Sequence, residues 1–221
     1  MCGRFTLTID IEGLLERFPF DVGPLTYQPR FNIAPTQQVL VYGAQGPRTA
    51  EHMRWGLVPS WAKDLSIGHR MINARAETLT ARSSFRTPLR THRCLVLADG
   101  FYEWKREGVA RTPMLVKLKA GEPFGFAGLW AEWRDPASRR QVRSCTIITT
   151  GANKLMAPIH ARMPVIISRE TEEAWLDPDV EDPSLLLSLL TPYPSESMGA
   201  YAVSSTVNSV HNEDPDCVLP V

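Results

Sequence analysis

The chain has 221 residues, 43% of them hydrophobic, and its 24 basic residues balance 24 acidic ones. This hydrophobic content supports a packed core and argues against intrinsic disorder, and the length suits one large domain or two small ones. No apolar run reaches the roughly 18 residues of a membrane span, and the start lacks the apolar stretch of a signal peptide. We therefore expect a soluble, intracellular protein.

The charges are unevenly distributed along the chain. Residues 54–106 contain ten basic and four acidic residues, whereas residues 170–221 contain eleven acidic residues and no lysine or arginine. Of the 24 basic residues 19 are arginine, whose guanidinium suits bidentate contact with phosphate. The two blocks can also neutralise each other across the fold. A basic face limited to one groove would suit a short polyanion better than a long duplex.

The four cysteines are Cys2, Cys94, Cys145 and Cys217, and no two of them form a C-x-x-C pair. Neither a disulfide framework nor a metal site is expected from this spacing. Cys94 and Cys145 lie in apolar runs, which predicts buried thiols in the core.

The N-terminal part of the chain predicts a helix followed by a loop and a strand. Apolar residues recur at helical spacing from Asp10 to Phe18, with Asp10 as N-cap and Pro19 closing the helix. Residues 21–30 contain two Gly-Pro or Gln-Pro steps and predict a loop. The apolar run Gln38–Tyr42 predicts a strand.

Two tryptophans and a basic segment follow. The stretch Met53–Trp61 has strand content that ends at a proline, and we expect Trp55 to pack in the core. Trp61 lies in a polar loop and is a candidate platform for base stacking. Residues 82–90 are basic and rich in hydroxyl groups, are expected to be partly helical, and include Arg86 as a candidate DNA contact.

Glu103 lies among three aromatic residues, directly after the buried strand expected at Arg93–Ala98 and a turn at Asp99-Gly100. If its side chain points inward, desolvation favours the neutral carboxyl and makes Glu103 a competent general acid or base. If it points outward, Glu103 is a solvated residue on the wet face of a strand. The sequence pattern leaves both interpretations open.

The second half of the chain predicts mainly strands joined by short loops. A polar hairpin or loop is expected at residues 134–143, one helical turn at Gly151–Met156, and an acidic loop in the tail. His160 lies between two strands in a loop flanked by prolines, a position that can display a functional group. The strands are expected at Met114–Lys119, Phe124–Trp130, Ser144–Thr150, Val165–Ser168 and Tyr201–Ser205, and the helices at Thr171–Leu176 and Ser184–Leu190. Asp182 is the expected N-cap of the second helix, with Pro183 at its first position.

Cys2 becomes the N-terminal residue if Met1 is removed, which a small residue at position 2 permits. An N-terminal cysteine carries an amine and a thiol on adjacent carbons, and both are partly nucleophilic near neutral pH. The amine can condense with an aldehyde to an imine, and the sulfur can then close a five-membered thiazolidine ring. The alternative is an ordinary cysteine at a frayed terminus.

Six short motifs occur in one order along the chain and together resemble the SRAP family, the SOS-response-associated peptidases. They are Met1-Cys2-Gly3-Arg4-Phe5, Asn32-Ile33-Ala34-Pro35, Trp55-Gly56-Leu57-Val58-Pro59, Ile72-Asn73-Ala74-Arg75-Ala76-Glu77, Ala98-Asp99-Gly100-Phe101-Tyr102-Glu103-Trp104 and His160-Ala161-Arg162-Met163-Pro164. Each motif alone has low specificity, whereas six in order with cysteine at position 2 are highly specific.

The resemblance implies a single α+β domain over residues 1–221, with coiled, branched, mostly antiparallel β-sheets and short flanking helices. It also implies a sensor and shield of abasic sites in single-stranded DNA during the DNA-damage (SOS) response. In this family the N-terminal cysteine forms a covalent crosslink with the ring-opened sugar. We expect no metal or organic cofactor, a monomer, a preference that extends to single-strand/double-strand junctions, and a cytoplasmic, nucleoid-associated location in a bacterium.

The resemblance also implies roles for individual residues. Cys2 corresponds to the nucleophile, Asn73 to a positioning group, Glu103 to the general acid/base, and His160 to the group that assists ring opening and crosslink reversal. The candidate DNA contacts are Arg4, Pro35, Trp61, Arg75, Arg86, Thr149 and Arg162. Some relatives have a second tryptophan where this chain has Ala62, so one stacking contact is absent here.

Two other functions fit the same residues. A cysteine peptidase could use Cys2, His160 and either Glu103 or Asn73, and could remove Met1 autocatalytically. A non-catalytic module could bind single strands through Trp61 and arginines, reversibly and without regard to a missing base.

Overall fold

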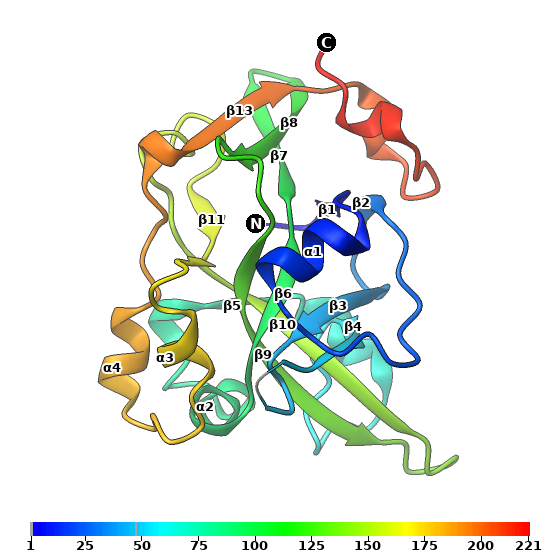
Figure 1. Ribbon diagram of the computed structural model, residues 1–221, viewed down its shortest axis with the longest axis vertical. Coiled ribbons are helices and arrows are strands. Elements are labelled where there is room, and N and C mark those ends of the chain that lie inside the picture. The colour runs from blue at the N-terminus through cyan, green and yellow to red at the C-terminus, as the bar shows by residue number, and fades with distance from the viewer. Residues whose placement is uncertain (1, 47) are drawn as a thin grey trace.

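The protein is built around two β-sheets, and its computed structural model describes residues 2–46 and 48–221 (Figure 1). The smaller sheet has the strand order β13 (Met198–Ala202), β8 (Ala110–Leu118), β7 (Gly100–Glu107), β1 (Phe5–Leu7) and β2 (Arg30–Ile33). The larger has the order β11 (Arg162–Pro164), β10 (Gln141–Gly151), β4 (Ala50–Trp55), β3 (Gln38–Tyr42), β6 (Arg93–Ala98), β9 (Phe124–Arg134) and β12 (Ile166–Ile167), with β5 (Asn73–Arg75) attached to β10.

Strand β10 makes the larger sheet branched. It pairs antiparallel with β9 and β11 and parallel with β4 and β5. Because β9 also pairs with β6, the strands β10, β4, β3, β6 and β9 close into a ring. The expected α+β fold with branched, mostly antiparallel sheets is therefore confirmed.

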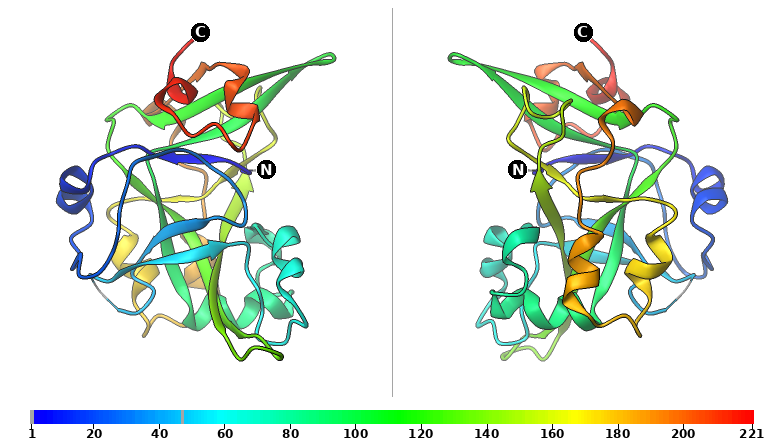
Figure 2. Two further views of the ribbon diagram at one scale, coloured as in Figure 1. Left: turned by 90° about the vertical axis from the view of Figure 1, so that its right-hand side faces the viewer. Right: turned by 90° about the vertical axis from the view of Figure 1, so that its left-hand side faces the viewer.

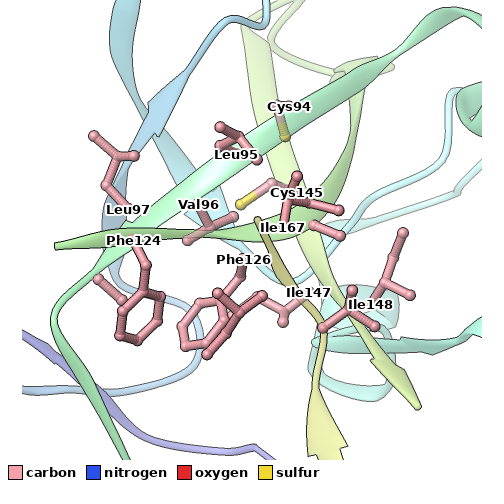
Figure 3. Packing of buried hydrophobic residues seen from close by; sticks show 14 of the residues in the cluster. Cys94, Leu95, Val96, Leu97, Phe124, Phe126, Cys145, Ile147, Ile148 and Ile167 are labelled. Carbon is pink, nitrogen blue, oxygen red and sulfur yellow. The ribbon is translucent and has the colours of Figure 1, made fainter. Parts of the chain in front are cut away.

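Residues of both sheets contribute to the hydrophobic core, which lies between the sheets and inside the larger one. All six residues of β6 are buried, and Figure 3 shows Cys94, Leu95, Val96 and Leu97 packed with residues of β9, β10 and β12. Phe5 of the smaller sheet contacts Trp55 and Phe126 of the larger one, with ring centroids 5.1 and 5.8 Å apart. One continuous apolar cluster therefore joins the two sheets into one domain. Trp55, Cys94 and Cys145 are fully buried, as the sequence predicts.

The turn expected at Asp99-Gly100 joins the two sheets and does not form a hairpin. β6 pairs with β3 and β9, and β7 pairs with β1 and β8, so the chain crosses from one sheet to the other at these two residues. The Asp99 carboxylate accepts hydrogen bonds from the hydroxyls of Thr6 and Thr8, and Lys117 lies 3.2 Å away. These bonds hold the crossing, and Gly100 has no room for a Cβ, which would lie 2.8 Å from Thr6 Oγ1.

The helices are short and flank the sheets. They are α1 (Ile11–Arg17), α2 (Ser83–Thr91), α3 (Glu172–Leu176) and α4 (Pro183–Ser188), with 3₁₀ turns at Leu65–Arg70, Ala76–Thr78, Ser195–Ser197, Ser205–Asn208 and Pro215–Val218. Asp10 caps α1 by accepting from Gly13 N (2.9 Å), and Asp182 caps α4 in the same way, as predicted. None of the described helices is long and apolar enough to cross a membrane.

Several boundaries differ from the sequence prediction. β4 ends at Trp55 because Gly56 has a φ of +123° and its Cβ position lies 2.7 Å from Gly68 O. The strand expected at 165–168 is shorter, because β12 covers only Ile166–Ile167. A separate short strand, β11 (Arg162–Pro164), precedes it. The last strand, β13, begins three residues earlier than expected, at Met198, where its register with β8 starts at Leu118. The helical turn expected at Gly151–Met156 lies slightly later in the chain, where Ala157 N donates to Asn153 O and His160 N donates to Met156 O.

Candidate functional site

Cys2 and Glu103 are brought together where β1 enters the smaller sheet. Phe5 pairs with Phe101, and Tyr102 N–H donates to Arg4 O (2.9 Å), so that the start of the chain lies beside Glu103. Cys2 is fully buried, and its Sγ lies 3.9 Å from Arg4 O. Burial, and then the negative charge of Glu103, raise the pKa of the Cys2 thiol far above its ordinary value. The thiol is therefore protonated at neutral pH.

Glu103 points into the protein. Only 4% of the residue is exposed, so the interpretation of Glu103 as a solvated residue is wrong. Neighbouring side chains of β7 point to opposite faces, and both faces are covered here: Phe101 packs in the main core, and Tyr102 packs in a second cluster with the C-terminal tail.

A second group of candidates lies at the end of β10. The parallel pairing of β5 with β10 places Asn73 opposite Ile147 and Arg75 opposite Thr149, and β11 places Arg162 opposite Gly151. The Asn73 amide nitrogen donates to Ile72 O (2.9 Å). Its Oδ1 is buried without a hydrogen-bond partner among the residues that the structure describes. This oxygen is an acceptor that a bound molecule could use.

The Arg162 guanidinium connects several of these residues. It donates to Thr149 O (2.6 Å), and its two terminal nitrogens each lie 3.0 Å from a carboxylate oxygen of Glu77. Arg162 is largely covered, whereas the Glu77 side chain is 53% exposed. The ion pair lowers the pKa of Glu77 through its hydrogen bonds with Arg162.

The main chain of Arg162 contacts the His160 ring. His160 Nδ1 lies 3.0 Å from Arg162 N and 3.1 Å from Arg162 O. When Nδ1 is unprotonated it can accept from the N–H, and when it is protonated it can donate to the carbonyl. Either tautomer of His160 therefore finds a backbone partner at Nδ1.

The two groups lie on the same side of the molecule. In Figures 1 and 2 the start of the described chain lies beside the end of β10 and close to β11. The cyan segment around Leu65–Arg70 and helix α2 lie on that side too (Figure 2). The segments that carry the predicted catalytic residues and most candidate DNA contacts therefore lie on one side of the molecule.

Trp61 and Pro35 are placed differently from each other. Trp61 is 59% exposed and stands between two hollows of 290 Å³ each, one of them next to α2. This exposure leaves the indole accessible to a base. Pro35 is partly buried and precedes Thr36, whose φ of +73° is rare for a β-branched residue. Arg75 and Arg86 are exposed.

Arg4 has an internal role. Its Nη1 donates to Asn32 Oδ1 (2.6 Å) and to Val207 O (2.7 Å), and its guanidinium lies 5.8 Å from the centre of the Trp104 ring. Asn32 is fully buried and donates to backbone carbonyls of Val207, Ser209 and Asn212. Arg4 therefore ties the start of the chain to its C-terminal tail. Its contact with DNA stays a prediction.

Sequence reasoning assigned no role to Asn32 or Glu77, although both lie in the quoted motifs. For Glu77 a signal exists, because it is one of only four acidic residues in the basic block of residues 54–106. For Asn32 there is no local signal, since its partners lie 175 or more residues away, apart from Arg4. No cluster of three or more metal-ligating side chains occurs among the described residues. A cavity of 740 Å³ between α1, the β3–β4 loop and α3 contains none of the predicted site residues.

Comparison with known proteins identifies the family. The model of the SOS response associated peptidase (SRAP) family matches residues 1–210. The chain is 47% identical to the abasic site processing protein YoqW of Bacillus subtilis, over 99% of both chains. It is 32% identical to the abasic site processing protein HMCES of Gallus gallus, over 88% of this chain and 67% of that one.

Solved structures agree with this match. A protein from Bacteroides thetaiotaomicron superimposes with a TM-score of 0.88 over the full length of both chains, at 27% identity. A protein from Bordetella bronchiseptica gives a TM-score of 0.78 over 92% of this chain and all of that one, at 25% identity. The chain belongs to the SRAP family.

Proposed function

We propose that this protein processes abasic sites in single-stranded DNA by joining the sugar aldehyde covalently to Cys2. The observation that carries the proposal is the position of Cys2, at the very start of the chain and beside the buried Glu103. The relatives are named as abasic site processing proteins, which supports the same substrate. Removal of Met1 would free the Cys2 amine, and an autocatalytic removal is part of the proposal.

The protonated thiol sets the order of the steps. Because burial and Glu103 keep the sulfur protonated, the amine is the first nucleophile. The amine nitrogen adds to the aldehyde carbon to give a carbinolamine, which loses water to form an imine. The sulfur then attacks the imine carbon while its proton moves to the nitrogen, which closes the thiazolidine. Aldehyde and aminothiol give thiazolidine and one water, so no cofactor is needed.

His160 is suited to opening the sugar ring. Opening requires a proton on the ring oxygen and removal of a proton from the C1′ hydroxyl. Since Nδ1 has a partner in either tautomer, Nε2 can release or take up a proton without rotation of the ring. The same property allows His160 to act in reversal of the crosslink, where proton transfers run backwards.

Glu103 and Asn73 act on the reacting groups. The Glu103 carboxyl can protonate the leaving hydroxyl of the carbinolamine, and it can then pass the thiol proton to the imine nitrogen as the ring closes. The unpartnered Oδ1 of Asn73 can accept a hydrogen bond from the amine or from a sugar hydroxyl.

The rest of the same face binds the strand in this proposal. Arg75, Arg86 and Arg162 contact phosphates, with Arg4 and Thr149 near the reacting sugar, and Pro35 and Trp61 contact bases. One SRAP domain over residues 1–221 acts as a monomer, with single strands or junctions as its DNA and the bacterial cytoplasm and nucleoid as its location.

The state of the Cys2 thiol disfavours a general cysteine peptidase. Such an enzyme needs a thiolate, which neighbouring positive charge or a paired histidine produces by lowering the pKa. Here burial and a carboxylate act in the opposite direction. Blocking only the amine separates the two functions, because a thiol peptidase works without it and the crosslink does not form.

The test is a denaturing gel of the tag-free protein with a single-stranded oligonucleotide that contains one abasic site. We expect a heat-resistant shifted band with the wild type and with Cys217→Ser, and none with Cys2→Ala or with intact DNA. No band from protein that mass spectrometry shows to lack Met1 would overturn the proposal. A complex that disappears in high salt would point to plain strand binding instead.

A further inference from the structure

The hairpin of β7 and β8 projects from the protein on the same side as the start of the chain (Figure 2). Its strands pair from Phe101 and Val116 out to Glu107 and Ala110, and Gly108 with a φ of +61° forms the turn. Val109 at the tip is fully exposed. The outer half of the hairpin therefore rests on nothing else in the described protein.

The two faces of this outer half differ in charge. On one face Lys105 and Glu107 form an ion pair of 2.6 Å and neutralise each other. On the other face Arg106 and Arg111 lie directly opposite each other in the register, both exposed, and neither forms an ion pair within the described part of the chain. Like charges at directly opposite positions destabilise a strand pair. A bound anion would remove that repulsion.

The cationic face lies close to the reactive centre along the same strand. Arg106 follows Glu103 by three residues, which is about 10 Å at the rise of a β-strand, and the tip is about 17 Å away. The odd spacing places Arg106 on the opposite face of β7 from Glu103, on the face of Trp104, whose ring lies 5.8 Å from the Arg4 guanidinium. Successive phosphates of one strand in a duplex are about 3.4 Å apart along the axis. The hairpin therefore spans the backbone about three to five nucleotides from a sugar held at Cys2.

We propose that the β7–β8 hairpin is an arm that binds the phosphodiester backbone flanking the abasic site, through Arg106 and Arg111. The arm rests on the proposed function for the position of the DNA. Two guanidiniums side by side suit phosphates, and the exposed Val109 adds apolar contact with a sugar or base. An acidic protein is disfavoured as the partner, because the neutral Lys105–Glu107 face restricts the charge to a narrow strip.

The test measures binding without chemistry. In a Cys2→Ser background, the affinity for a labelled, intact single strand is measured by fluorescence anisotropy from 50 to 200 mM salt. The slope of the logarithm of the affinity against the logarithm of the salt concentration should be smaller by about 1.4 in R106A/R111A, because two phosphate contacts are lost. From 50 to 200 mM salt, the affinity of the wild type should therefore fall about sevenfold more than the affinity of the variant. The matched control is R134A/R140A, which removes the same charge from the β9–β10 hairpin at the other end of the molecule (Figure 1).

The outcomes separate this inference from the proposed function. A reduced slope in R106A/R111A with an unchanged slope in R134A/R140A supports the arm, and equal slopes in the two variants overturn it. Substrates with a duplex on either the 5′ or the 3′ side of the strand identify the flank that the arm contacts, because R106A/R111A should change the binding of only one of the two. Sensitivity on neither side also overturns the arm. Whether the Cys2 protein crosslinks abasic DNA is read independently on the denaturing gel.

Discussion

Replacing Asn32 by alanine should destabilise the protein far more than an ordinary loss of one polar side chain. Asn32 is fully buried, accepts from Arg4 Nη1 (2.6 Å), and donates to the carbonyls of Asn212 (2.7 Å), Ser209 (2.9 Å) and Val207 (3.3 Å). The Asn32 amide has only two N–H groups, so these contacts amount to three full hydrogen bonds, which at about 1 kcal/mol each give a loss of about 3 kcal/mol. For a protein of this size that lowers the melting temperature by about 6 to 12 °C.

The assay is thermal unfolding by circular dichroism, with Asn208→Ala as the matched control. Asn208 is exposed and makes one side-chain bond, from Trp104 Nε1 (2.7 Å), so that its replacement costs about 1 kcal/mol. A melting temperature of Asn32→Ala that falls no further than that of Asn208→Ala would refute the network as a stabilising element. Amide exchange adds a local readout, since protection should decrease first in residues 205–218.

Two further substitutions test ion pairs near the site. Glu77→Gln should tighten binding of single-stranded DNA by up to about fivefold in the Cys2→Ser background. The reason is that Arg162 keeps its bond to Thr149 but loses the exposed carboxylate that neutralises it. Fluorescence anisotropy measures the affinity, and weaker binding would contradict the prediction. Glu213→Gln should destabilise the protein more at pH 7 than at pH 3. Burial raises the pKa of Glu213, but its bonds to Arg30 and to backbone N–H groups outweigh burial and lower the pKa, so the stabilisation is present above the unfolded pKa and is lost as the pH falls through the folded one. Urea unfolding at both pH values checks this, and an equal loss at both would count against it.

Local signals in the sequence were enough for the elements that depend on local physics. Strands β3 and β6 begin and end at the predicted residues, because each is a short apolar run bounded by polar or turn residues. Helices α1 and α4 start after the aspartates that were predicted to cap them. The predicted boundaries were wrong where tertiary contacts determine them. At Gly56, for example, the backbone of Gly68 lies so close that there is no room for a Cβ.

The orientation of Glu103 could not be predicted because alternation along a strand identifies a wet face only when one face of the sheet is exposed. Here the C-terminal tail covers the second face of β7, and the residues that do so are about 100 positions away in the sequence. The bond from Arg162 to Glu77 has the same character, since 85 residues separate the partners. The family resemblance indicated which residues belong to the site, and the contacts among them required the structure.

The reaction that we propose needs the least constrained part of a chain, its N-terminus, at a fixed position. Terminal residues fray unless other parts of the protein hold them. Strand β1 has only three residues, and two of them, Phe5 and Thr6, pair with β7. This pairing is too short to fix the residues that precede β1 by itself. The bonds of Arg4 to Asn32 and Val207 supply the missing restraint from the other end of the chain. The C-terminal tail therefore restrains the residue two positions after Cys2, and with it the position that the proposed reaction requires of the start of the chain.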